Sequence, residues 1–280
     1  MSAAYSPRTL IEAHEALFLG AIKVAGTTDL LVIDHATGRE HAAVLNVLGI
    51  AELQGIRTDE AGLSIGASST FTQIRDSGDV TSHAPMLAAA AATIGAAQIQ
   101  NRATIGGNIA NASPAGDSLP ALLALGAQIL LAGPKGRRTV PYDTFHTEYR
   151  KTVMGADELI ERVIIPLPSP MIQVFRKVGT RTAQSISKVV VGLSGTRRDG
   201  GLRDVRLAMG SVAAVPIRLR VAEVLIESEA LSMGLADRAA TLVEKTIQPI
   251  DDIRSTADYR RHVAGQVVRR ILLDLVESTS

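Results

Sequence analysis

The chain has 280 residues, of which 46% are hydrophobic, 20% charged and 3% aromatic, and it contains neither cysteine nor tryptophan. This length suffices for one large domain or two, and the lack of cysteine excludes disulfides, zinc–thiolate sites and any iron–sulfur cluster ligated by this chain. With 29 Lys and Arg residues against 28 Asp and Glu, the net charge of +1 predicts neither nucleic-acid nor membrane-surface binding. No apolar run reaches the ~20 residues of a membrane helix, and Glu12, His14 and Glu15 interrupt the amino-terminal apolar segment. We therefore expect a soluble cytoplasmic protein without a signal peptide.

The first part of the chain is expected to form a helix, a strand and a polar turn. An amphipathic helix is predicted over residues 6–18, with a proline in its first turn, where proline is tolerated. Residues 22–25 predict a short strand that runs into the turn 26–29 and then into the apolar segment 30–33. N–H groups and hydroxyls at a strand end commonly bind phosphate, and we refer to residues 23–30 as the first loop.

Two strands and two helices are expected next. Residues 44–48 and 63–67 are rich in the aliphatic residues typical of strands. Residues 70–76 predict a short helix. Residues 83–92 predict a longer one, which Pro85 opens and which ends in five consecutive alanines, the residue with the highest helix propensity.

Residues 104–117, which we call the second loop, are the most unusual stretch of the sequence. They combine adjacent glycines with hydroxyl, Asn, Pro and Asp side chains and contain no bulky residue. Gly106 and Gly107 have no Cβ, so they can take positive φ and let a ligand lie against main-chain N–H groups. Asp117 would repel a phosphate alone but suits a ligand that also offers hydroxyl or ring N–H donors, such as a nucleotide cofactor. Ordinary turn chemistry would give the same composition, but the first loop upstream favours the cofactor.

A domain boundary is predicted at the prolines that follow. Residues 119–125 predict a helix, and residues 127–131 and 159–165 predict strands. Three prolines within residues 166–170 make a stiff connector. The expected domains therefore cover residues 1–168 and 171–280.

The second domain is expected to contain a small sheet covered by helices. Strands are predicted over residues 174–178, 187–193 and 202–211, the last two joined by a Gly-Gly hairpin turn. Helices are predicted from Pro216 to Ile226, from 236 to 246, and after a capping box of Ser255 and Asp258. A three-stranded antiparallel sheet covered by three helices is an α+β domain.

No sequence motif for catalysis or metal binding occurs. The glycine patterns of dinucleotide-binding and phosphate-binding loops are absent, as are the zinc-protease and serine-hydrolase motifs. The six histidines are scattered without ligand spacing. We therefore assign no catalytic residue and no metal ligand to this chain.

The two loops and this architecture resemble the FAD-binding medium subunit of the molybdenum hydroxylases, the family of xanthine dehydrogenase and aerobic carbon monoxide dehydrogenase. Residues 24–30 are similar to the family's first FAD loop and residues 104–117 to its second. Shorter similar pieces extend the resemblance over essentially the whole chain: residues 149–152, 158–160, 175–179, 186–189, 210–212 and 249–260.

The resemblance implies an α+β fold whose first domain binds FAD. This domain, residues 1–168, would be of the two-lobed PCMH type, similar to vanillyl-alcohol oxidase, with the lobes divided near residues 55–60 and FAD in the cleft between them. A smaller α+β domain of the carbon monoxide dehydrogenase flavoprotein type, residues 171–280, would follow.

The candidate FAD-binding residues implied by the resemblance are those of the two loops and three single positions. They are Lys23, Val24, Ala25, Gly26, Thr27, Thr28, Asp29, Leu30, Ile94, Thr104, Gly106, Gly107, Asn108, Ser113, Asp117, Ile160 and Lys177.

The resemblance gives these residues distinct roles. The first loop would wrap the pyrophosphate, the second would continue the cradle, and the hydroxyl of Thr104 would bind phosphate. Asp117 would accept hydrogen bonds from ribityl or ring donors, and Lys177 would reach the flavin edge. Ile94 would pack on flavin or adenine, and Ile160 would line the adenine pocket.

The first loop departs from the family at one position. Its usual Gly-Gly pair is Gly26-Thr27 in this sequence, so a side chain stands where many relatives have none.

The implied function is electron transfer. The chain would be an FAD-dependent oxidoreductase subunit that passes electrons from the 2Fe-2S clusters of a small iron–sulfur subunit through FAD to NAD⁺, O₂ or another acceptor. A molybdopterin-binding large subunit would oxidise the substrate, in a heterotrimer or a dimer of heterotrimers. Two alternatives remain: a flavin-free scaffold subunit of such an assembly, or a stand-alone FAD-dependent oxidase.

Overall fold

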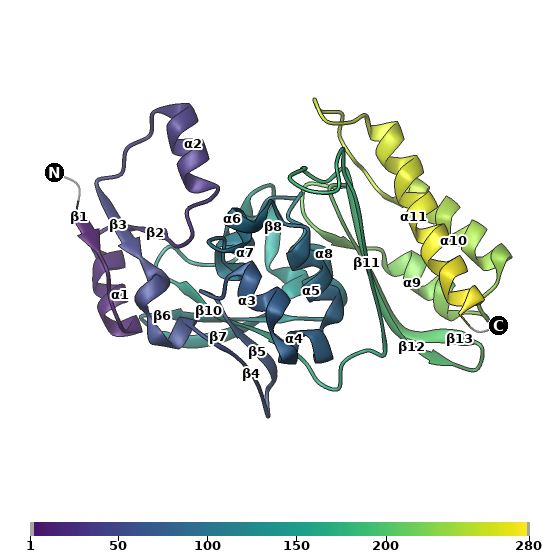
Figure 1. The fold of residues 1–280 in the computed structure, drawn as a ribbon, viewed down its shortest axis with the longest axis horizontal. Coiled ribbons are helices and arrows are strands. Elements are labelled where there is room, and N and C mark those ends of the chain that lie inside the picture. Colours follow the sequence, from purple (N-terminus) through teal and green to yellow (C-terminus); the bar gives the residue numbers. More distant parts are fainter. Residues whose placement is uncertain (1–2, 279–280) are drawn as a thin grey trace.

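A three-stranded parallel sheet forms the first lobe of the protein (Figure 1), seen in a computed structural model that describes residues 3–278. Its strand order is β1-β3-β2, with β1 (Ala3–Tyr5), β2 (Ile22–Val24) and β3 (Ala43–Asn46). Helix α1 (Leu10–Phe18) connects β1 to β2, and α2 (Leu30–Thr37) connects β2 to β3. No residue of α2 is buried, and this helix lies apart from the others at the top of Figure 1.

The first lobe differs from the sequence predictions in three places. Helix α1 begins at Leu10 rather than at residue 6, because the Thr9 hydroxyl caps it by accepting from the Glu12 N–H at 3.3 Å. The apolar segment 30–33 is the first turn of α2. The strand predicted over 44–48 ends at Asn46, whose side chain caps a short 3₁₀ helix, η1 (Val47–Gly49); η2 (Ala51–Leu53) follows.

The second lobe is built on a five-stranded antiparallel sheet of order β4-β5-β10-β6-β7. Strand β5 is buried throughout, and β10 is buried at all but one residue, as expected for strands covered on both faces. The strands are β4 (Ile56–Asp59), β5 (Gly62–Gly66), β6 (Gln128–Gly133), β7 (Gly136–Pro141) and β10 (Leu159–Ile165). A 3₁₀ helix, η3 (Tyr142–Thr144), and a small hairpin of β8 (His146–Glu148) and β9 (Lys151–Thr152) lie between β7 and β10.

Six helices connect β5 to β6. They are α3 (Phe71–Asp76), α4 (Gly78–His83), α5 (Pro85–Ala92), α6 (Ala97–Gln100), α7 (Ile105–Asn111) and α8 (Ser118–Ala124). All seven residues of α8 are buried. A helix that is buried on every face must be packed on several sides, and α8 contacts α5, α7 and strands of the second domain.

The second domain is a four-stranded antiparallel sheet with three helices on one face (Figure 1). The strands follow chain order: β11 (Ile172–Val178), β12 (Val189–Arg198), β13 (Gly201–Gly210) and β14 (Ile217–Arg218). The helices are α9 (Arg220–Glu227), α10 (Met233–Thr246) and α11 (Ala257–Glu277). Residues of the sheet and of these helices form a second hydrophobic core. None of the helices in residues 3–278 is long and apolar enough to cross a membrane.

Two predictions for this domain were wrong. The sheet has a fourth strand, because Ile217 and Arg218, predicted to be helical, pair with β13 and delay the helix to Arg220. The last helix is capped by Thr256, whose hydroxyl accepts from the Tyr259 N–H at 3.2 Å. Ser255, the predicted cap, instead donates its N–H to Asp252.

Glycines let the two domains approach closely. A Cβ added at Gly192 of β12 would lie 3.0 Å from the Pro120 carbonyl oxygen of α8 and 3.1 Å from the Met86 sulfur of α5. A Cβ added at Gly210 of β13 would lie 2.9 Å from a Pro120 ring carbon. Helix α8 therefore lies directly on the backbone of the second sheet.

We expect Gly192→Val to lower the free energy of unfolding by about 1–3 kcal/mol, because the branched side chain forces the sheet away from α8. Denaturant unfolding measures this loss. Gly78→Val is the matched control, since a Cβ there meets no atom within 4 Å. Equal unfolding midpoints for the two variants would contradict the close approach.

Candidate functional site

The first loop meets the segment that immediately precedes the second loop. A Cβ added at Gly26 of the first loop would lie 1.9 Å from the Arg102 carbonyl oxygen and 3.0 Å from the Ala103 Cα, so no side chain fits at this position. Arg102 and Ala103 immediately precede Thr104, where the second loop begins. Segments that are far apart in the sequence are therefore in backbone contact.

The second loop begins as a helix, which the sequence analysis did not predict. Thr104 is the N-cap of α7 and accepts from the Gly107 N–H through its hydroxyl at 3.1 Å. Gly106 and Gly107 are helical, so neither takes the positive φ that glycine permits. The residue of this stretch with a left-handed backbone is Ala112, with φ 49°, which ends the helix.

The N–H groups at the start of α7 bond within the protein. Ile105 donates to the Ser69 carbonyl at 3.0 Å, and Gly106 donates to the Ala67 carbonyl at 2.9 Å. Asn108 donates to the Thr104 carbonyl at 3.0 Å. The predicted row of open N–H groups at residues 106–108 is therefore wrong, because the end of β5 and the Thr104 cap already occupy these donors.

The two adjacent glycines have different surroundings. A Cβ at Gly106 would lie 2.7 Å from the Ala67 Cβ and 2.8 Å from its carbonyl oxygen, so this glycine is needed for packing against the end of β5. At Gly107 the only atom near an added Cβ is the Thr104 hydroxyl oxygen, at 3.0 Å, and the residue is exposed. Gly107 thus presents bare helix backbone at the surface.

Open N–H groups occur in the first loop instead. Gly26, Thr27 and Thr28 donate no backbone hydrogen bond to any of the described residues 3–278. They are followed by Asp29, the N-cap residue of the eight-residue helix α2. Consecutive free N–H groups that lead into a helix form a favourable environment for an anion such as a phosphate.

Thr27 holds a strained backbone conformation in this loop. Its φ is 58°, in the left-handed region that β-branched residues rarely adopt. Its hydroxyl donates to the Gly26 carbonyl at 2.9 Å. The side chain therefore stands at the one position of the loop where the backbone favours glycine.

Asp117 and Lys177 form a buried ion pair between the two domains. The Lys177 ammonium lies 2.6 Å from Asp117 Oδ2 and also donates to the Thr93 carbonyl at 2.9 Å. The hydroxyl of Ser187 donates to the other Asp117 oxygen. Both charged side chains are 8% exposed. Burial raises the pKa of Asp117, and the adjacent ammonium opposes that rise. Within the protein, the Asp117 carboxylate thus accepts its hydrogen bonds from Lys177 and Ser187, which belong to the second domain.

Two other polar residues of the predicted site also have protein partners. Lys23 extends from β2 to donate to the Gly155 carbonyl in the second lobe at 3.4 Å, and burial lowers the pKa of its ammonium. Asn108 accepts from the Ser118 hydroxyl at 2.7 Å, which connects α7 to the start of α8 beside Asp117.

The remaining predicted residues surround the same region. Ile160 in β10 is buried in the first core, Ile94 packs against that core, and β10 contacts α7. Ser113 accepts from the Ala115 N–H at 3.3 Å in the turn between α7 and α8. Val24 ends β2, Ala25 packs against the first core, and Leu30 begins α2. The contacts of Gly26 with Arg102, of Asn108 with Ser118 and of Asp117 with Lys177 thus connect the first loop to the segment before α7, α7 to α8, and α8 to β11.

Several partners of these residues were not predicted from the sequence. Thr93 and Ser187 complete the surroundings of Asp117. Arg150 donates to the Asn111 side-chain oxygen at 2.9 Å and lies 3.6 Å from the Asp29 carboxylate. The sequence signal for Arg150 was its place in the family-like segment 149–152, which gave no hint of either contact.

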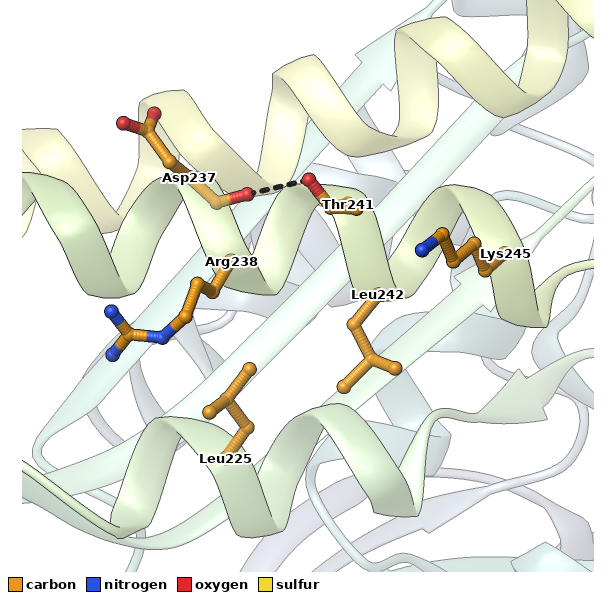
Figure 2. Close-up of a pocket in the computed structure, with 6 residues that line it drawn as sticks. All are labelled: Leu225, Asp237, Arg238, Thr241, Leu242 and Lys245. Carbon is orange, nitrogen blue, oxygen red and sulfur yellow. Dashed lines mark hydrogen bonds between the residues drawn. The ribbon is translucent and has the colours of Figure 1, made fainter.

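A separate surface groove lies in the second domain, between α9 and α10. It has a volume of about 410 Å³, and Figure 2 shows Leu225 and Leu242 pointing toward one another across it. Thr241 donates to the Asp237 carbonyl at 3.0 Å, while Asp237 and Arg238 pair with Arg269 and Glu229. None of the predicted FAD-binding residues lines this groove.

Comparison with known proteins identifies the family. A family model described as the FAD binding domain in molybdopterin dehydrogenase matches residues 1–168, and one described as the CO dehydrogenase flavoprotein C-terminal domain matches residues 174–275. The chain belongs to the FAD-binding medium subunits of the molybdenum hydroxylases. It is therefore an oxidoreductase-family flavoprotein subunit, and the predicted fold class and family are confirmed.

The alignments with individual relatives extend over most of both chains. The xanthine dehydrogenase FAD-binding subunit of Escherichia coli O157:H7 is 31% identical over 90% of this chain and 88% of its own length. The carbon monoxide dehydrogenase medium chain of Hydrogenophaga pseudoflava is 30% identical, covering 89% and 87%. A solved carbon monoxide dehydrogenase from that organism superposes with a TM-score of 0.91 at 28% identity, covering 96% and 95%.

We expect Thr27→Gly to raise the free energy of unfolding of the FAD-free subunit by about 1 kcal/mol, because it relieves a left-handed β-branched residue. Thermal unfolding measures the change. Thr28→Gly, whose φ is not positive, is the control and should destabilise the protein. A Thr27→Gly protein no more stable than Thr28→Gly would refute the strain.

We expect Lys177→Met to lower the free energy of unfolding by about 3–5 kcal/mol at neutral pH, because it leaves a buried carboxylate unpaired. Burial raises the pKa of Asp117 in the folded protein above its ordinary 3.8. Protonation of this carboxyl therefore favours the folded state, and its contribution to stability falls as the pH rises from 3.8 through the pKa of the folded protein.

Unfolding at about pH 7 and about pH 4 measures this effect, and the loss should shrink at the lower pH, because protonation removes the Asp117 charge that Lys177 no longer pairs. The double variant Lys177→Met with Asp117→Asn should recover part of the lost stability. A loss that is independent of pH and is not recovered by Asp117→Asn would contradict the role of the carboxylate.

Proposed function

We propose that this chain binds FAD and passes electrons through it from the 2Fe-2S clusters of a partner small subunit to NAD⁺, O₂ or another acceptor. The observation that carries the proposal is the backbone contact between Gly26 and Arg102, which brings the first loop, with its open N–H groups at residues 26–28, against the segment that leads into α7. This donor set fits a pyrophosphate. The absence of a side chain at the exposed Gly107 fits a cofactor laid against the backbone.

The candidate residues divide into groups that would hold different parts of FAD. The first loop would hold the pyrophosphate, with the Thr104 hydroxyl, which keeps its own proton while it caps α7, as a further donor. Ile94 and Ile160 would supply apolar contacts to the rings. Asp117 and Lys177 would form the polar wall at the flavin end while remaining paired with each other. When bound, FAD supplies the redox chemistry, and the protein binds and orients it.

We further propose that substrate oxidation takes place on a partner subunit. The names of relatives, such as medium chain and FAD-binding subunit, support an assembly of a small iron–sulfur subunit, this chain and a molybdopterin-binding large subunit. A heterotrimer or a dimer of heterotrimers in the cytoplasm would result. Relatives of similar identity are named for xanthine, nicotinate and carbon monoxide, so we assign the choice of substrate to the large subunit.

An absorption spectrum of the purified chain, before and after incubation with FAD, tests the proposal. We expect the visible bands of oxidised flavin at one equivalent per chain and their loss on reduction. A colourless protein that takes up no added FAD would instead indicate the flavin-free scaffold. Substrate turnover by the isolated yellow protein would indicate the stand-alone oxidase.

We expect Gly107→Val to raise the dissociation constant for FAD by at least about tenfold, because the branched side chain occupies the surface where backbone would meet cofactor. Quenching of flavin fluorescence measures it. Gly106→Ala is the matched comparison and should instead lower the thermal stability of the FAD-free protein, since its Cβ meets Ala67. Unchanged affinity in a folded Gly107→Val protein would refute the placement.

A further inference from the structure

Arg150 connects the two halves of the candidate site. It lies in the turn between β8 and β9, and its Nη1 donates to the side-chain oxygen of Asn111, the last residue of α7, at 2.9 Å. The same nitrogen lies 3.6 Å from Oδ2 of Asp29 in the first loop. Among residues 3–278, Arg150 is the one side chain with polar contacts to both the first loop and α7.

Arg150 has an unusual backbone conformation. Its φ is 54°, in the left-handed region that non-glycine residues seldom adopt. The hairpin around it is held by pairing of β8 with β9 and by the Val153 N–H, which donates to the Phe145 carbonyl at 3.0 Å. Strained residues persist where the surrounding structure determines them, and they cluster at functional sites.

Asp29 needs a cation if an anionic ligand binds in the first loop. It directly precedes α2, and its side chain makes no capping hydrogen bond. An unpaired carboxylate beside the open N–H groups of residues 26–28 would repel a phosphate. The guanidinium of Arg150 offsets this charge and, through Asn111, ties it to α7.

We propose that Arg150 is a positioning residue of the FAD site, which holds the first loop against α7 and compensates the charge of Asp29. This inference rests on the proposed FAD function. Arg150 acts by keeping two segments of different lobes in register, so its loss should loosen the first loop while leaving both hydrophobic cores intact. Arginine suits this role because one planar group can serve several acceptors.

The test compares FAD binding by Arg150→Ala, Asn111→Ala, the double variant and Arg150→Lys, each purified without FAD. Lys151→Ala is the matched control, since Lys151 is the next residue of the same hairpin and pairs only with Glu148 among the described residues. Flavin-fluorescence quenching gives the dissociation constant. Limited proteolysis of the FAD-free protein reports the exposure of residues 24–30 without any FAD.

We expect Arg150→Ala to raise the dissociation constant about tenfold, the size of effect typical of a lost hydrogen bond to a charged group, and to speed cleavage within the first loop. Asn111→Ala should act in the same direction, and the double variant should be no worse than Arg150→Ala. Arg150→Lys should recover part of the affinity, and Lys151→Ala should match the wild type.

Two results would overturn the inference alone: wild-type affinity and wild-type proteolysis in Arg150→Ala, or losses in the two single variants that add in the double variant. If the wild-type chain itself binds no FAD, the proposed function fails with it. An unchanged melting temperature across the variants shows that a loss of affinity does not come from unfolding.

Discussion

The contact between the Gly26 backbone and the Arg102 carbonyl is the constraint on which the candidate site depends. It fixes the end of β2, in a parallel sheet, against the segment that starts α7, in a lobe built on an antiparallel sheet. Only glycine allows this approach, because any Cβ would overlap a carbonyl oxygen that is itself part of the backbone. The same contact leaves the next N–H groups of the first loop without protein partners.

The second domain contributes a charged side chain, Lys177, to the candidate site. Lys177 reaches from β11 to Asp117 at the start of α8, within an interface where glycines bring backbone and helix together. Removing both ions from water is costly, and such a pair is favourable only when its remaining donors and acceptors are satisfied. Thr93 and Ser187 satisfy them here. This network therefore specifies how the two domains are joined beside the proposed flavin position.

Much of the fold could be read from the sequence, but the local geometry of the candidate site could not. Strands such as β5 and β10 could be predicted from their runs of apolar residues, and helix α5 from the high helix propensity of its alanines. Helix α7 was missed because its first N–H groups are satisfied by carbonyls of Ala67 and Ser69, which no local pattern reveals. The short strand β14 depends likewise on pairing with β13.

The residues of the site were easier to name than their contacts. Asp117 was identified from its loop, but its partner Lys177 lies 60 positions away and in another domain. In the sequence, Arg150 looks like an ordinary residue of a hairpin turn. Only its distances to Asp29 and Asn111 show that it connects the first loop to α7. Contacts of this kind are set by how the lobes pack, which the residue pattern does not encode.

Hydrogen–deuterium exchange with and without FAD tests most directly whether the two loops form one cofactor site. We predict that FAD slows exchange in residues 24–30 and 104–117 together, with the largest change at the unbonded amides of residues 26–28, and leaves exchange around the groove between α9 and α10 unchanged. Protection of only one loop, or protection confined to the second domain, would contradict it.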